Sequence, residues 1–219
     1  MLVHKSPLDA REEIYLLQSL RDQIGMKLYP LHRLDKATSG LVLFAKDPKF
    51  VSPLQKLWEE NKIEKTYYAL VRGWLEEEVL VEKPLEEMAR KRDQKKASDA
   101  VLKPAKSLIT PLENYEWDYE IGKFPSQRYQ LVRVKIYTGR KHQIRRHLVH
   151  LRHPIIGDTT YGDNKHNKAI RSLSPEAGLM LQAFKLSFPC PFHLCLMDFE
   201  LPLCPRIQAH LVQMKPAKK

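Results

Sequence analysis

Apolar and basic residues alternate regularly within residues 128–137, and this pattern limits the possible folds more than any other in the sequence. Val132, Val134 and Ile136 fall on one side of an extended chain, because successive side chains of a strand point to opposite faces. The residues between them are basic. The pattern therefore predicts a strand with one face in the core and one wet, basic face.

Segments of strand and helix character surround this strand. The other expected strands cover residues 41–45, 66–72, 179–188 and 197–203, and the expected helices begin at Ser52-Pro53 or cover 141–151 and 206–214. Strand 41–45 is expected to be buried on both faces. Helix 141–151 is expected to place Ile144, Leu148 and Leu151 on one stripe, with its basic residues mostly around the rest of the helix. Strands outnumber helices without strict strand–helix–strand order, which favours an α+β fold with a mixed or antiparallel sheet.

A charged segment, residues 82–106, interrupts this pattern and has a proline near each of its ends. We expect a solvated loop between two halves of one sheet, with a domain boundary as the alternative. The 219 residues are 43% hydrophobic, enough to bury a sizeable core. A single domain over residues 1–219 is therefore expected.

The net charge of the chain indicates which kind of partner it binds. Lys and Arg number 37 against 26 Asp and Glu, a formal charge of +11, which is expected of a protein that binds a polyanion. Nucleic acid is the first candidate and an acidic membrane surface the second. The apolar runs fall far short of the roughly 20 residues that cross a bilayer, and no secretion signal begins the chain. We expect a cytoplasmic protein whose three cysteines, Cys190, Cys195 and Cys204, are reduced thiols.

The first segment with chemical potential is residues 32–40, HRLDKATSG, which directly precedes the strand expected at 41–45. Its one carboxylate, Asp35, lies among cations, and Gly40 permits an unusual backbone angle. Loops supported by a rigid strand concentrate catalytic groups. The alternative is that Asp35 and Ser39 only satisfy hydrogen bonds of a turn.

The second segment is residues 138–148, TGRKHQIRRHL, in which cations gather where a helix begins. Because a helix N-terminus attracts anions, the segment predicts a phosphate seat. Its cations are Arg140, Lys141, Arg145 and Arg146. The alternative is a solvated basic helix face. The four histidines of residues 142–153 lack the spacing of metal ligands, so no metal site is expected.

The third segment, residues 65–73, places aromatic residues beside cations, a combination that suits base stacking and phosphate contact. Tyr67 and Tyr68 point to opposite faces of the expected strand.

Together these segments resemble the signatures of the RluA-type pseudouridine synthases. Residues 32–40 resemble HRLD-x-x-TSG, residues 138–147 resemble TGR-x-HQ[IL]R-x-H, residues 65–67 resemble K-x-Y, and residues 153–162 match HPI-x-GD-x-x-YG. Within the family, residues 71–74 and 146–153 are most similar to the branch that modifies transfer RNA. Family members usually begin with a further strand and a K-P-x-G segment, so the chain is expected to lack that strand.

The resemblance implies a pseudouridine synthase fold: a mixed, largely antiparallel sheet flanked by helices and loops, with an active-site cleft between two halves. It implies isomerisation of uridine to pseudouridine in RNA, with uridine 65 in the T stem of transfer RNA as the expected target. The reaction gains and loses no atoms, so no cofactor is expected, and neither DNA nor a membrane is expected as a partner. An RluA-type enzyme of ribosomal RNA and a non-catalytic RNA-binding protein with this fold remain alternatives.

The resemblance also assigns roles to residues. Asp35 would act on the ribose or the base, as nucleophile or as base. Arg145 would orient Asp35 and keep it ionised, and Tyr67 would stack on the target base and help with proton transfer.

The remaining roles concern RNA contact. Arg33 would fill the gap left by the flipped uridine, and Ile144 would be a packing wall of the pocket. Further RNA contacts are expected from Thr38, Arg140, Lys141, His142 and Arg146.

Overall fold

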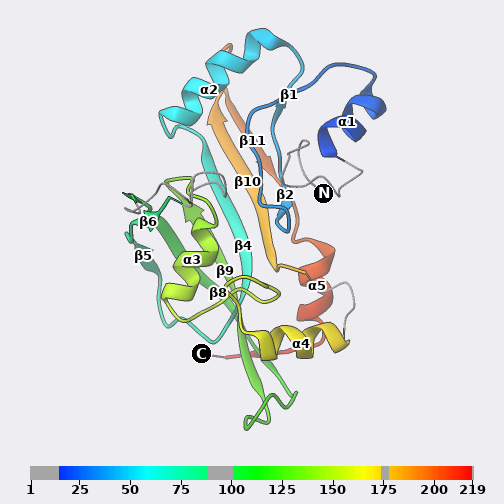
Figure 1. The fold of residues 1–219 in the computed structure, drawn as a ribbon, viewed down its shortest axis with the longest axis vertical. Coiled ribbons are helices and arrows are strands. Elements are labelled where there is room, and N and C mark those ends of the chain that lie inside the picture. The colour runs from blue at the N-terminus through cyan, green and yellow to red at the C-terminus, as the bar shows by residue number, and fades with distance from the viewer. Residues whose placement is uncertain (1–14, 88–100, 174–177, 219) are drawn as a thin grey trace, which may run out of the picture.

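The computed structural model describes residues 15–87, 101–173 and 178–218. Its centre is an eight-stranded sheet with the path β11-β10-β4-β9-β8-β12, in which β2 also pairs with β10 and β5 with β8 (Figure 1). The strands are β2 (Ser39–Gly40), β4 (Glu64–Arg72), β5 (Val79–Val81), β8 (Ser107–Trp117), β9 (Gln127–Ile136), β10 (Leu181–Pro189), β11 (Leu196–Glu200) and β12 (Lys215–Ala217). Among these pairs β2–β10 is parallel and the others are antiparallel. The predicted α+β class with a mixed, largely antiparallel sheet is confirmed.

Strand β9 matches the alternation that the sequence predicts. Val132 and Val134 are fully buried, whereas Arg133 is exposed. Strand β9 lies between β4 and β8, so its apolar face has neighbours on both sides, and Tyr67 of β4 is directly opposite Val134.

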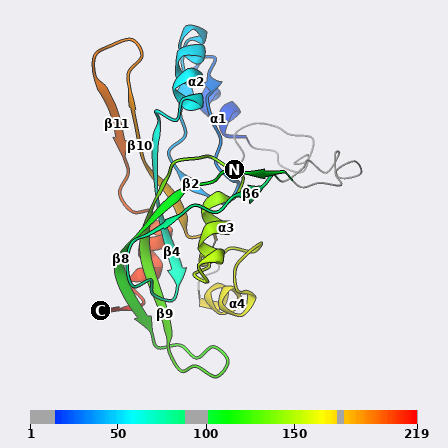
Figure 2. The ribbon, with the colours of Figure 1, turned by 90° about the vertical axis from the view of Figure 1, so that its left-hand side faces the viewer.

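The helices are α1 (Leu16–Ile24), α2 (Val51–Glu59), α3 (Gln143–His150), α4 (Asn164–Leu173) and α5 (Pro205–Leu211). Helices α3 and α4 lie on one face of the sheet (Figure 2). Ile144 and Leu148 of α3 are buried in the same apolar cluster as the inward residues of β9. The predicted apolar stripe is thus confirmed, and two basic residues of this helix are buried as well. Arg145 and His147 are buried because each finds polar partners inside.

The expected strand at residues 41–45 is wrong in its extent. Only Phe44–Ala45 is regular, as β3, and it pairs with β1 (Tyr29–Pro30). The chain leaves β10 after Leu41, whose N–H donates to the Ala183 carbonyl oxygen, and then turns to a different partner. This change of partner explains why the segment is half-buried for most of its length.

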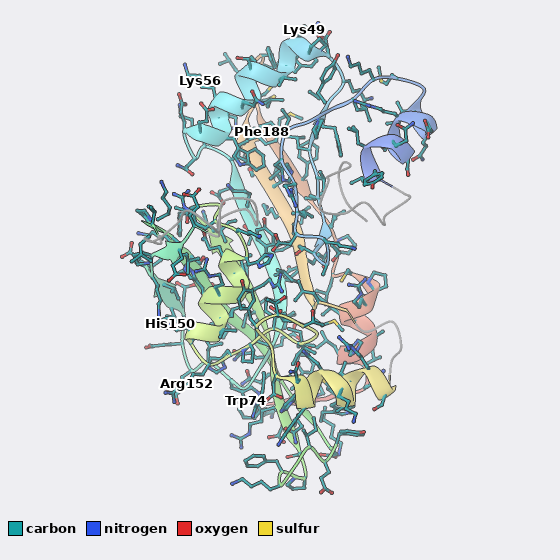
Figure 3. The ribbon with its side chains drawn as sticks, viewed as in Figure 1. Lys49, Lys56, Trp74, His150, Arg152 and Phe188 are labelled. Atoms are coloured by element: carbon teal, nitrogen blue, oxygen red, sulfur yellow. The ribbon has the colours of Figure 1, made fainter. Side chains whose placement is uncertain are left out.

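The helix expected to begin at Ser52-Pro53 begins slightly earlier. The Asp47 carboxylate accepts the N–H of Lys49 and caps a short 3-10 turn, Pro48–Phe50, from which α2 continues. A second apolar cluster lies against α2 and includes Leu54 and Phe188 (Figure 3). Asp47-Pro48 therefore has the role expected of Ser52-Pro53.

The charged segment 82–106 separates two strands of one sheet, as expected. Strand β5 ends just before it, β8 begins just after it, and Val81 lies opposite Ser107. Two short strands inside the segment, β6 (Leu85–Glu86) and β7 (Leu102–Lys103), pair with each other. The residues between them, 88–100, and the N-terminal residues 1–14 lie outside the described part of the chain. The single domain over 1–219, the missing N-terminal strand and the cleft between two halves therefore remain predictions.

Candidate active site

The loop that carries Asp35 is anchored at both ends. At its start the Nε2 atom of His32 accepts the N–H of Leu43 at 2.9 Å. Burial and then the Lys65 ammonium lower the pKa of His32 to about 4, so its ring is neutral and free to accept this bond. At its end Ser39 donates its hydroxyl to the Leu181 carbonyl oxygen at 3.3 Å. His32 is therefore a structural anchor of the loop.

Gly40 lets the loop approach β10. Its φ is 117°, a conformation that L-residues with side chains rarely adopt, and a Cβ atom there would overlap the carbonyl oxygen of Ala183. Ser39 and Gly40 pair with one edge of β10, and Tyr67 of β4 pairs with Ala183 on the other edge. The glycine of the first motif thus sets the position of Asp35.

Arg145 is held by a buried carboxylate that the sequence analysis did not select. Its Nε and one terminal nitrogen donate to the two oxygens of Asp158 at 2.8 and 2.7 Å. Asp158 also accepts the backbone N–H groups of Thr160 and Tyr161, at 2.9 and 3.0 Å. Burial alone would raise the pKa of Asp158, but the hydrogen bonds from Arg145 and these N–H groups outweigh it and lower that pKa. Asp158 is therefore ionised and fully hydrogen-bonded, and it holds the Arg145 guanidinium in place.

The remaining terminal nitrogen of Arg145 faces Asp35. The distance from this nitrogen to Asp35 Oδ2 is 3.9 Å, and the distance from His142 Nε2 to Asp35 Oδ1 is 3.8 Å. The Asp35 side chain is 30% exposed, against 8% for Arg145, so the carboxylate is accessible while its cationic neighbour is enclosed. The structure thus brings together the two residues that the first and second motifs supply.

Tyr67 is the third expected residue at this place. Burial, and then the negative charge of Asp35, raise the pKa of Tyr67 well above its usual value. Its hydroxyl therefore keeps its proton at neutral pH and is suited to donate. Tyr68 points the other way and stacks on Phe184 with 3.7 Å between ring centroids.

Tyr161 completes the cluster around Arg145. The guanidinium carbon lies 5.1 Å from the centre of the Tyr161 ring, and the Tyr161 hydroxyl lies 3.1 Å from His142 Nδ1. Asp158 and Tyr161 belong to the segment 153–162 that carried part of the family resemblance. Their place in that motif was the signal that could have selected them.

The cations of the second motif do not form one seat. Arg145 turns inward to Asp158, Arg140 donates to the Pro104 carbonyl oxygen at 3.0 Å, and Arg146 donates to that of Glu86 at 3.0 Å. Lys141 is exposed. The predicted four-cation phosphate seat is wrong for Arg145, because a buried guanidinium takes the carboxylate that neutralises it.

Two further expected RNA contacts lie on the Asp35 loop. Arg33 is exposed, and within the described residues it has no ion pair. Thr38 is half-buried and donates its backbone N–H to the Asp35 carbonyl oxygen at 2.9 Å, which closes the turn.

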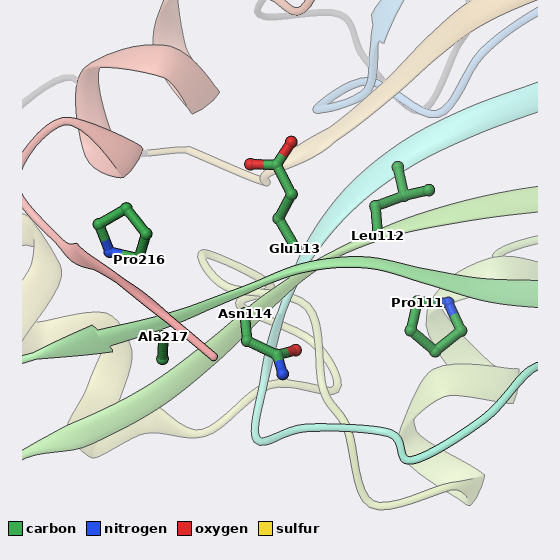
Figure 4. Close-up of a pocket in the computed structure, with 6 residues that line it drawn as sticks. All are labelled: Pro111, Leu112, Glu113, Asn114, Pro216 and Ala217. Atoms are coloured by element: carbon green, nitrogen blue, oxygen red, sulfur yellow. The ribbon is translucent and has the colours of Figure 1, made fainter. Parts of the chain in front are cut away.

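A hollow of about 370 Å³ lies elsewhere, between β8 and β12 (Figure 4). It is lined by Pro111, Leu112, Glu113, Asn114, Pro216 and Ala217. This lining contains neither a cation nor a residue of the motifs, so we do not assign the hollow to the site. Within the described ranges no group of three or more His, Cys, Asp or Glu side chains could hold a metal ion. The helices of the same ranges are too short or too polar to cross a membrane.

Comparison with known proteins shows the family of the chain that carries these residues. Residues 1–150 match the sequence profile described as RNA pseudouridylate synthase. The tRNA pseudouridine synthase C of Vibrio parahaemolyticus is 46% identical over 193 residues, which cover 88% of this chain and 78% of that protein. The chain belongs to the RNA pseudouridylate synthase family. The resemblance to RluA-type pseudouridine synthases predicted from the motifs is thereby confirmed.

Other members of the pseudouridylate synthase family agree in sequence and in fold. The tRNA pseudouridine synthase C of Pasteurella multocida is 43% identical over 194 residues, 87% of this chain and 79% of that protein. The structure of human RNA pseudouridylate synthase domain containing 1 superposes with a TM-score of 0.73 at 23% identity, over 99% of this chain and 88% of that one. This likeness confirms the pseudouridine synthase fold.

Proposed function

We propose that this protein isomerises uridine to pseudouridine in transfer RNA, with Asp35 as the catalytic carboxylate. The observation that carries the proposal is the approach of Arg145 to Asp35, at 3.9 Å, in a member of the pseudouridylate synthase family. Tyr67 of a third motif supports it, because the charge of Asp35 helps to raise the Tyr67 pKa. The names of the relatives, tRNA pseudouridine synthase C, support transfer RNA as the substrate. Because transfer RNA of the bacteria that hold these relatives is cytoplasmic, we also propose a cytoplasmic location.

The reaction breaks the bond between uracil N1 and ribose C1′, turns the base, and joins C5 to C1′. The proton lost from C5 is balanced by the one gained at N1, so the chain needs neither an oxidant nor a second substrate. Asp35 can serve as nucleophile or as base at the sugar, since both roles need an ionised carboxylate that substrate can reach. The Asp35 side chain is 30% exposed and so can be reached by substrate, and the Arg145 guanidinium lies 3.9 Å from one of its oxygens.

Tyr67 and Arg33 have complementary roles in this proposal. Burial and the charge of Asp35 raise the pKa of Tyr67, so its hydroxyl keeps its proton and donates to the flipped base. Arg33 projects from the same loop as Asp35 and fills the space that the uridine leaves in the stem. Thr38, Arg140, Lys141 and Arg146 contact the RNA backbone around the site, where the excess positive charge favours phosphate.

A turnover assay tests this function directly. Purified protein is incubated with unmodified transfer RNA and with ribosomal RNA transcripts, and pseudouridine is measured by nucleoside analysis. We expect product from transfer RNA, and mapping in a deletion strain identifies the uridine, for which position 65 is the expectation. Product from ribosomal RNA alone would show that the protein is an RluA-type enzyme of ribosomal RNA instead. Binding without product from any RNA would leave a non-catalytic RNA-binding protein.

A further inference from the structure

The backbone of His142 is unusual for a residue at the start of a helix. Its φ is 54°, in the left-handed region, although it is not glycine. Its carbonyl oxygen nevertheless accepts the N–H of Arg146 at 3.0 Å and so begins α3. As a result the ring lies beside Asp35 with 19% of its side chain exposed.

The two neighbours of the ring decide which nitrogen carries the proton. Nδ1 lies 3.1 Å from the Tyr161 hydroxyl, and Nε2 lies 3.8 Å from Asp35 Oδ1. A neutral imidazole has one N–H and one lone pair. A lone pair on Nε2 would be repelled by the carboxylate, whereas an N–H there is attracted. The arrangement therefore favours Nε2–H towards Asp35, with the Tyr161 hydroxyl donating to Nδ1.

Burial and the neighbouring cations together favour the neutral form of the ring. Burial lowers the pKa of His142, and the Arg145 guanidinium and Lys141 ammonium act in the same direction. The Asp35 and Asp158 carboxylates act in the opposite direction without restoring the usual value. The ring is thus available as an uncharged donor at neutral pH.

We infer that His142 is a positioning residue for Asp35, holding Oδ1 through Nε2–H while Arg145 holds Oδ2. Both distances are about 1 Å longer than a hydrogen bond, and such contacts often shorten when substrate binds. With one donor on each oxygen, the carboxylate is fixed in one rotation towards the flipped nucleoside. This role replaces the RNA contact that the sequence suggested for His142, and it rests on the proposed function.

Two amide substitutions separate this role from an RNA contact. The amide nitrogen of His142→Gln reaches the place of Nε2, whereas that of His142→Asn reaches only the place of Nδ1, and Asn tolerates the left-handed backbone better. We expect single-turnover rates at saturating enzyme to fall about 10- to 100-fold for His142→Asn, the range of a hydrogen bond to a charged group. His142→Gln should recover most of the rate, and the Kd for RNA should be unchanged in both variants.

Equal rates for the two variants, or a loss confined to Kd, would overturn the inference. A second measurement needs no substitution and therefore no assumption about folding. Nitrogen-15 NMR of the wild-type imidazole at neutral pH should show the proton on Nε2 of His142, and a proton on Nδ1 alone would contradict the role. A wild-type protein without turnover would refute the proposed function instead, while these NMR signals would still report the arrangement of the ring.

Discussion

The two sides of the site are held in opposite ways. Arg145 is enclosed, with two hydrogen bonds to a carboxylate that is itself fully buried. Asp35 lies on a loop without regular structure between β1 and β2, and its side chain is 30% exposed. The orienting group is thus fixed by the fold, while the reactive group stays accessible to substrate. Substitutions on the two sides should therefore fail differently, by unfolding on one side and by loss of chemistry on the other.

The largest effect on folding is expected from Asp158→Asn. Removal of this charge takes from the buried Arg145 guanidinium the carboxylate that it hydrogen-bonds and leaves only Asp35, 3.9 Å away, as a counter-charge. Breaking a buried pair in this way typically costs about 3–5 kcal/mol. Urea denaturation should show this loss, whereas Asp118→Asn, at an exposed pair with Lys215, should change little. Because folding lowers the pKa of Asp158, its contribution is present above the unfolded-state value of about 4 and is lost as the pH falls through the folded value. A deficit that stays constant into acid would contradict the pairing.

Tyr67→Phe should remove most of the turnover and leave RNA binding intact, because the ring remains while the donating hydroxyl is lost. We expect a fall of about 100-fold, typical of a positioned proton donor. Tyr68→Phe is the matched control, since Tyr68 lies on the opposite face of β4. If the Tyr68 variant lost turnover and the Tyr67 variant did not, the assignment of the two faces would be wrong. Single-turnover rates and filter binding measure the two quantities.

Arg33→Ala should slow the reaction about tenfold on a folded stem and much less on an unpaired uridine. The reason is that unstacking costs a few kcal/mol in a helix and less where the base is already free. Arg171→Ala, an exposed arginine of α4, serves as the control for general loss of charge. Equal defects on the two substrates would restrict Arg33 to phosphate contact.

The smallest effect concerns the exposed cations. Lys141→Ala should weaken binding modestly and reduce the slope of log Kd against log salt by about one, the value for one lost phosphate contact. Lys56→Ala, on α2 (Figure 3), should leave the slope unchanged. The salt series thus tests whether Lys141 contacts a phosphate, and identical slopes for the wild type and both variants would show that it does not.

The sequence was sufficient where a local pattern has one physical solution. The alternation in β9 and the apolar stripe of α3 could be predicted because each needs one buried face. The interior position of Arg145 could not be predicted from charge, because its partner Asp158 lies 13 residues further along the chain. Likewise the chain after Gly40 changes its strand partner after Leu41. Contacts with residues distant in the sequence determine this change, so a local pattern could not predict it.

The same limit applies to the long strand β8, which no pattern in the sequence had indicated. Its ladder with β9 shifts register between Pro111 and Glu113, so its alternation is broken where the strand is irregular. Asp158 and Tyr161 belong to a motif that the sequence shows, but the motif does not say which residues they contact. Motif resemblance could place the site in the chain, and the structure was needed to show which side chains meet.

In the proposed reaction the Asp35 carboxylate carries the chemistry, so Asp35→Asn is the decisive substitution. The substitution keeps the size of the side chain and removes its charge, so the melting temperature and the Kd for transfer RNA should be retained. Asp22→Asn, at an exposed position of α1, is the matched control. The measurement is tritium release from transfer RNA labelled at uridine C5, at saturating enzyme. We predict a loss beyond the roughly 10²- to 10⁴-fold of an acid or base alone, and readily detectable turnover by Asp35→Asn would contradict the account.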